Sequence, residues 1–182
     1  MRVFLIVAAL VVLPLSQLGA QQPPPPQVTR PPGTDEEVVM LLHRDSRNAI
    51  ALGDLARRKG VAQPVRDYGT LVMRDFESLD ARLATYARTR RVDPRRMQAP
   101  YQAWDPTSAE LDQLRALQGP AFDREFLTTM ISRNQSFIER ARSAQLLTHD
   151  QALKDILGEA LPAMRTELAT GQSLAAPPAA RR

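Results

Sequence analysis

The chain has 182 residues, a formal net charge of +4, 43% hydrophobic residues and no cysteine. This length suffices for one domain with a buried core. Without cysteine, the chain forms no disulfide, no thiolate metal site and no cysteine nucleophile. Aromatic residues make up only 5%, and the sequence lacks alternating runs of β-branched residues, so helices are favoured over sheets. The small net charge argues against nucleic-acid binding.

The first 20 residues, MRVFLIVAALVVLPLSQLGA, have the pattern of a secretory signal. Arg2 gives a charged start, a short apolar stretch follows, and the small residue Ala20 is suited to cleavage. The apolar stretch is shorter than the roughly 20 residues that a membrane span needs. We therefore expect a cleaved signal rather than a retained anchor, and a periplasmic or secreted mature protein without a transmembrane span. Residues 21–33, QQPPPPQVTRPPG, predict an extended proline-rich leader.

The next segment predicts two long helices in a hairpin. The first runs over 34–59 and opens with a Thr-x-x-Glu capping box of Thr34 and Glu37. Gly60 is placed for the left-handed residue that often ends a helix. Pro64 fits the first turn of the second helix, where its missing N–H has no effect. The short link between the helices makes them antiparallel neighbours.

The second half of the chain predicts two more long helices and a short one. Asp105 and Pro106 predict the start of a short accessory helix that ends near Gln118. A long helix follows over 120–145, and the last one opens with a Thr-x-x-Gln capping box at Thr148. The bundle domain would thus cover 34–170, and residues 171–182 are expected to form a disordered tail.

Together these elements predict an all-α fold, a four-helix ferritin-like antiparallel bundle with a short accessory helix in the long middle connection. A helix of 25 residues is roughly 37 Å long, and the residues between the two hairpins are numerous enough to cross that length. One long crossover between hairpins is the ferritin-like topology. A plain up-down-up-down bundle remains the alternative.

Four short segments carry a family resemblance. They are LGDLARRKG at 52–60, VMRDF at 72–76, GPAFDREFL at 119–127 and ALPAMRTEL at 160–168. In this order and spacing they resemble a bacterial family catalogued as domain of unknown function 4142, a group of exported, ferritin-like helical proteins. The resemblance covers about residues 35–174. It implies a fold and a compartment rather than an activity.

The chain departs from the family pattern where relatives often carry histidine or glutamate. Phe76, Asn134 and Glu167 stand where histidine is common, and Ala49 stands where glutamate is frequent. If those family residues form a metal or proton site, this chain lacks most of it.

Each long helix carries one polar residue within its apolar stripe. These residues are Asp45, Asp75, Asn134 and Glu167. Facing inward from four helices, they are candidate ligands for manganese, magnesium or calcium, which prefer oxygen donors. The Glu-x-x-His motif of di-iron bundles is missing, however. We therefore favour a polar layer that fixes helix register, with Arg82 or Arg133 neutralising a carboxylate, and expect no bound cofactor.

An enzyme is not expected. His43 is about 200° around its helix from Asp45, and His149 lies in the first turn of the last helix, which we expect to be exposed. The chain contains no Ser-His-Asp order, glycine-rich phosphate loop or metalloprotease motif. The sequence thus predicts a non-catalytic exported bundle with a structural or interaction role in the periplasm or envelope. A metal-binding ferritin-like bundle that uses core carboxylates is the alternative.

The middle connection is rich in arginine. Arg90, Arg91, Arg95 and Arg96, with Tyr101 and Trp104 nearby, suggest weak contact with anionic lipid headgroups of the envelope. A solvated loop is the simpler interpretation, and we favour it. The sequence itself names no partner.

Overall fold

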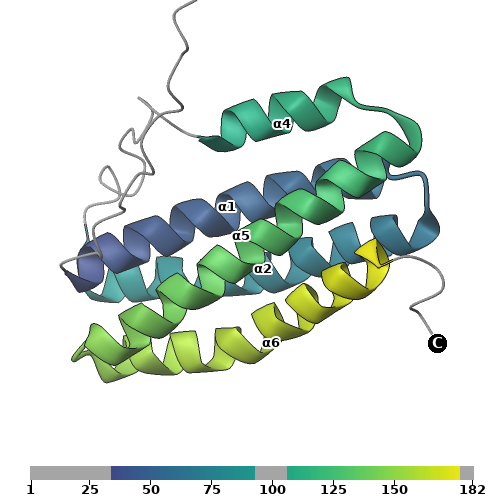
Figure 1. Cartoon of the computed structure of the whole chain (residues 1–182). Helices are drawn as coiled ribbons and strands as arrows, with labels where there is room; N and C mark the ends of the chain where they lie inside the picture. Colours follow the sequence, from purple (N-terminus) through teal and green to yellow (C-terminus); the bar gives the residue numbers. More distant parts are fainter. Residues whose placement is uncertain (1–33, 93–105, 177–182) are drawn as a thin grey trace, which may run out of the picture. The chain divides into compact units, whose positions relative to one another are not determined.

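A computed structural model describes residues 34–92 and 106–176 (Figure 1). These ranges contain helices and no strand, so the all-α prediction is confirmed. The helices are α1 (Asp35–Lys59), α2 (Gln63–Thr89), α4 (Pro106–Ala116), α5 (Gly119–Leu147) and α6 (Gln151–Ala175). Within the described ranges, no helix combines the length and the apolar character that a membrane crossing requires.

Several sequence predictions fall outside the described residues. They concern the signal at 1–20, the leader at 21–33, the cap residue Asp105, and the side chains of Arg95, Arg96, Tyr101 and Trp104.

The four long helices form an antiparallel bundle. α1 pairs with α2 and α5 with α6, and the two hairpins meet through the pairs α2–α6 and α1–α5. Asp123, near the start of α5, binds the link between α1 and α2, whereas Asp150, just before α6, pairs with Arg90 just after α2. Because α2 and α5 therefore run in the same direction, the chain must return along the bundle between them. This long crossover confirms the ferritin-like topology and excludes the up-down-up-down alternative.

The short helix α4 packs on α1 and α5 (Figure 1). Leu114 is fully buried, and Leu111 and Leu117 pack partly against the core. Lys59 donates to the backbone carbonyl oxygen of Arg115, which satisfies one of the carbonyl groups left open at a helix C-terminus. The predicted accessory helix is confirmed, although it ends at Ala116 rather than near Gln118.

The apolar stripes predicted for the long helices are buried in one core. Aromatic rings connect the two hairpins, since Phe76 of α2 meets Phe137 of α5 edge to face, with 5.3 Å between ring centroids. Phe76 is 2% exposed and fills the core at the turn where the sequence placed Asp75. The Asp75 side chain is 15% exposed and lies at the edge of the stripe.

Helix ends were predicted with mixed success. The capping box of α1 is confirmed, because the Thr34 side chain accepts from the Glu37 N–H and the Glu37 side chain accepts from the Thr34 N–H. The capping box at Thr148 is wrong. Asp150 caps α6 instead and accepts from Ala152 N–H at 2.9 Å. α5 runs on to Leu147, so Thr148 closes that helix rather than opening the next.

Two glycines have roles that the sequence did not reveal. Gly60 has φ −57° and is not left-handed, but a Cβ on it would lie 2.7 Å from the Ala56 carbonyl oxygen. Gly171 lies inside α6, which continues to Ala175, so the predicted tail begins too early. A Cβ on Gly171 would lie 2.8 Å from the Tyr68 hydroxyl oxygen. Both glycines therefore permit a close approach.

Candidate functional site

The structure brings together three of the four polar residues predicted to face inward. Asp75 of α2, Asn134 of α5 and Glu167 of α6 meet where these three helices adjoin. Asp45 of α1 lies apart from them. Its carboxylate accepts from Arg140 Nη2 at 2.6 Å across the α1–α5 contact. Because α1 is diagonal to α6 in the bundle, Asp45 and Glu167 face different neighbours.

Asn134 is the hydrogen-bonding centre of this polar cluster, which comprises Tyr68, Asp75, Asn134 and Glu167. Its Nδ2 donates to Glu167 Oε2 at 3.3 Å and to the Tyr68 hydroxyl oxygen at 3.4 Å. Asn134 and Glu167 are fully buried, and Tyr68 is 2% exposed. Three helices are thus joined by polar contacts inside an apolar core.

Tyr68 is the member of the cluster that sequence reasoning missed. The periodic pattern of α2 placed it among the apolar stripe residues, and its ring does pack there, against Phe126. A buried tyrosine hydroxyl nevertheless needs a polar partner. That requirement was the available signal, because an inward-facing tyrosine in a bundle with inward-facing polar residues is expected to meet one of them.

Burial controls the charge of the Glu167 carboxyl. Its pKa is raised to about 9. Loss of solvation is the main cause and the negative charge of Asp75 the second, whereas the hydrogen bond from Asn134 lowers the pKa. Glu167 is therefore neutral at neutral pH. Burial and the proximity of Glu167 also raise the pKa of the Tyr68 hydroxyl. Two buried polar atoms of the cluster, Glu167 Oε1 and Asn134 Oδ1, have no hydrogen-bond partner within residues 34–92 and 106–176.

Asp75 connects the polar cluster to the surface. Its Oδ1 accepts from Arg74 Nε at 2.8 Å, and its carboxylate also interacts with the carboxyl of Glu167. Arg74, rather than the predicted Arg82 or Arg133, is the arginine that pairs with Asp75. Arg82 pairs with Glu159 at 2.5 Å and Arg133 with Glu110 at 2.5 Å.

The cluster contains two acids, Asp75 and Glu167. Throughout the described ranges, no three histidine, aspartate or glutamate side chains gather in a group that could hold a metal ion. Asp75 and Glu167 supply two carboxylates only. His43 is bonded instead to Asp80, with 2.5 Å between Nδ1 and Oδ1 across the α1–α2 contact. The contacts of the cluster provide hydrogen bonds, and the raised pKa of Glu167 lets its carboxyl hold a proton.

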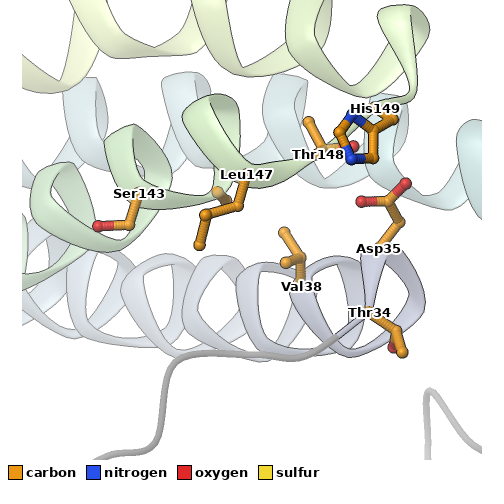
Figure 2. Close-up of a pocket in the computed structure, with 8 residues that line it drawn as sticks. Thr34, Asp35, Val38, Ser143, Leu147, Thr148 and His149 are labelled. Atoms are coloured by element: carbon orange, nitrogen blue, oxygen red, sulfur yellow. The ribbon is translucent and has the colours of Figure 1, made fainter.

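A small hollow opens where α1 begins and α5 ends (Figure 2). Its volume is about 300 Å³, and its floor includes Val38 and Ala144. Figure 2 shows the Asp35 carboxylate and the His149 ring turned toward one another at its rim. His149 is exposed, as the sequence predicted. Besides this carboxylate and imidazole, the hollow is lined by the hydroxyl residues Thr34, Ser143 and Thr148.

Asp123 is a second residue whose role the sequence did not show, although it lies within the segment GPAFDREFL. Its Oδ1 accepts from the Val61 N–H at 2.9 Å and its Oδ2 from the Ala62 N–H at 2.8 Å. Ala62 precedes α2 and has no side chain that can cap it. The carboxylate of α5 therefore caps α2 from another helix, so this residue of the family segment is structural.

Comparison with known proteins identifies one family. A family model described as "Domain of unknown function (DUF4142)" matches residues 20–174, from before α1 to the penultimate residue of α6. No curated protein and no solved structure matches the chain. Because the family match spans well over half of the sequence, this chain belongs to the DUF4142 family of helical domains of unknown function.

Proposed function

We propose that this chain is a non-catalytic, exported helical-bundle protein with a structural or interaction role in the bacterial periplasm or envelope. One observation carries the non-catalytic part of this proposal. The polar residues that were candidates for a common site are engaged with other side chains of the bundle, Asp45 with Arg140 and Glu167 with Asn134 and Asp75.

The metal-binding alternative receives no support from this arrangement. A carboxylate site in a ferritin-like bundle draws acids from several helices toward one point. Here Asp45 is held at the α1–α5 contact by Arg140, and Asp75 is held toward the surface by Arg74. The remaining acid, Glu167, is neutral at neutral pH because burial raises its pKa to about 9.

Contact with the envelope through the arginines of the middle connection is not part of the proposal. Arg90 pairs with Asp150, and its guanidinium lies 5.6 Å from the centroid of the Tyr86 ring. These contacts join the end of α2 to the start of α6. At this position Arg90 therefore helps to hold the helices of the bundle together.

The export part of the proposal rests on the sequence of residues 1–20, whose charged start and short apolar stretch are typical of a cleaved signal. The test is expression of the full chain in a bacterial host, followed by cell fractionation and mass spectrometry of the intact protein. We expect a periplasmic or secreted product that begins at Gln21. A cytoplasmic product, or a membrane-bound one that retains Met1, would contradict the proposal.

A further inference from the structure

The carboxyl groups of Glu167 and Asp75 interact although Glu167 is fully buried. Arg74 acts on Glu167 only through space, because its guanidinium is hydrogen-bonded to Asp75. Among the residues that the structure describes, Asn134 gives Glu167 one donor, at Oε2, and Oε1 has none. An ionised Glu167 would therefore be a buried charge beside a second negative charge, which is an expensive arrangement.

One proton bound to the pair removes the repulsion between the two carboxylates. Two ionised carboxylates are both acceptors and cannot hydrogen-bond to each other. When one of them is protonated, its O–H donates to the other, and the pair becomes a short hydrogen bond with one negative charge. Asp75, which is 15% exposed and paired with Arg74, is the better place for that charge. Glu167 is the better place for the proton.

We propose that Glu167 and Asp75 share one proton, and that this proton latches α6 onto α2 and α5. The groups that face the carboxyl of Glu167 are Asp75, Arg74 and Tyr68 from α2 and Asn134 from α5. With the proton present, these contacts are neutral or attractive. Without it, Asp75 repels the buried charge, and the hydrogen bond from Asn134 and the positive charge of Arg74 remain to oppose that repulsion.

A second contact between α6 and α2 lies one helical turn after Glu167. Gly171 is buried, and its backbone lies so close to Tyr68 that a Cβ would come within 2.8 Å of the hydroxyl oxygen. Tyr68 also accepts the hydrogen bond of Asn134. Movement of α6 away from Asp75 would therefore loosen the Gly171–Tyr68 contact too. We expect the part of α6 that follows Ala160 to open first.

The direction of the pH dependence follows from proton linkage. The latched state binds the proton with a pKa of about 9, whereas a solvated glutamate releases it near 4.3. Between these values only the latched state carries the proton, so opening becomes easier by up to about tenfold per pH unit as the pH rises. The latch is at full strength below about pH 4.3 and is lost as the pH passes 9.

Two measurements on the same protein test the proposal. Carbon-13 labelling of glutamate carboxyl groups lets NMR follow each titration, and Glu167→Gln identifies the Glu167 signal by its loss. Amide hydrogen exchange, corrected for the intrinsic base-catalysed rate, reports the opening of α6. We expect the Glu167 signal to titrate near pH 9 and the protection of residues 160–175 to fall steadily up to that pH.

Two variants separate the latch from general alkaline instability. In Glu167→Gln the amide donates to Asp75 without titrating, so the pH dependence of α6 protection should vanish. Asp45→Asn removes an acid paired outside the cluster and should leave that dependence intact. Titration of Glu167 near its ordinary pKa would overturn the proposal, as would α6 protection that falls equally in the protein and in Glu167→Gln. If Glu167→Gln does not fold, the NMR titration of Glu167 and the amide hydrogen exchange of α6 in the unmodified protein still test the proposal.

Discussion

Gly53 of α1 and Gly69 of α2 face each other where the first two helices cross, and a Cβ on either would lie 2.7 Å from the carbonyl oxygen of the other. The two backbones are thus in direct contact at this point. The contact explains why a segment rich in good helix formers contains two helical glycines. One added methyl group at either glycine therefore tests the contact between α1 and α2.

The substitution Gly53→Ala should therefore destabilise the protein by about 1–3 kcal/mol, even though alanine favours an isolated helix by about 1 kcal/mol over glycine. The new Cβ would also meet Met73 Cγ at 2.9 Å. Gly158→Ala is the matched control, because its Cβ would meet only the flexible end of Gln145, at 3.0 Å. Urea denaturation of both variants measures the difference. Equal stabilities would show that the close contact is not a constraint.

Asp123 should be needed for the stability of the α1–α2 link. Asp123→Ala leaves the N–H groups of Val61 and Ala62 without their acceptors and should cost about 1–3 kcal/mol. Asp123→Asn keeps one acceptor oxygen, so its loss should be smaller. Asp112→Ala is the control. Its side chain is 72% exposed and pairs with the exposed side chain of Arg115, so the change should stay within about 0.5 kcal/mol. Thermal unfolding should therefore show the largest loss of stability for Asp123→Ala and the smallest for Asp112→Ala. Any other order would contradict the capping of α2 by Asp123.

Global stability should also depend on the charge of Glu167. Because its folded pKa is raised to about 9, the folded state binds one more proton than the unfolded state between about pH 4.3 and 9. The free energy of unfolding then falls with rising pH by up to about 1.4 kcal/mol per unit. Glu167→Gln should remove this contribution, and its advantage over the unmodified protein should grow from acid to alkaline pH. Denaturant titrations at several pH values measure the difference, and a constant difference would contradict the assignment.

Tyr68 and Gly171 should be energetically coupled. Gly171→Ala places a Cβ 2.8 Å from the Tyr68 hydroxyl oxygen and should destabilise the protein. Tyr68→Phe removes that oxygen, so Gly171→Ala should cost less in the Tyr68→Phe background. A double-mutant cycle should give a coupling of about 0.5–3 kcal/mol. Additive effects would mean that the hydroxyl group does not limit how closely α6 approaches α2.

Much of the fold was predictable because helical periodicity reports which face of each helix is buried. The stripes of all four long helices enter the core as expected, apart from the exchange of Asp75 for Phe76. Topology was left open, because the length of the middle connection permits either arrangement. Long-range contacts decide it, above all those of Asp123 and Asp150, and neither contact has a local sequence signal.

The candidate site was predictable only in part, for a related reason. Periodicity shows that a residue faces inward but not which neighbouring helix it meets. Asn134 and Glu167 were placed together correctly, whereas Asp45 faces α5 and finds Arg140. The partner of Asp75 was missed because Arg74 is its immediate neighbour in sequence and largely exposed. The long, flexible side chain of Arg74 allows its guanidinium to contact the carboxylate of Asp75.

The central claim is that Tyr68, Asp75, Asn134 and Glu167 form a hydrogen-bonded cluster within the core rather than a metal site. The most direct test is elemental analysis of the protein purified without a metal-affinity tag, followed by titration with manganese, iron(II) and calcium. We predict no stoichiometric metal and no change in the melting temperature. One metal ion per chain, lost in Asp75→Asn but retained in Asp45→Asn, would contradict the claim.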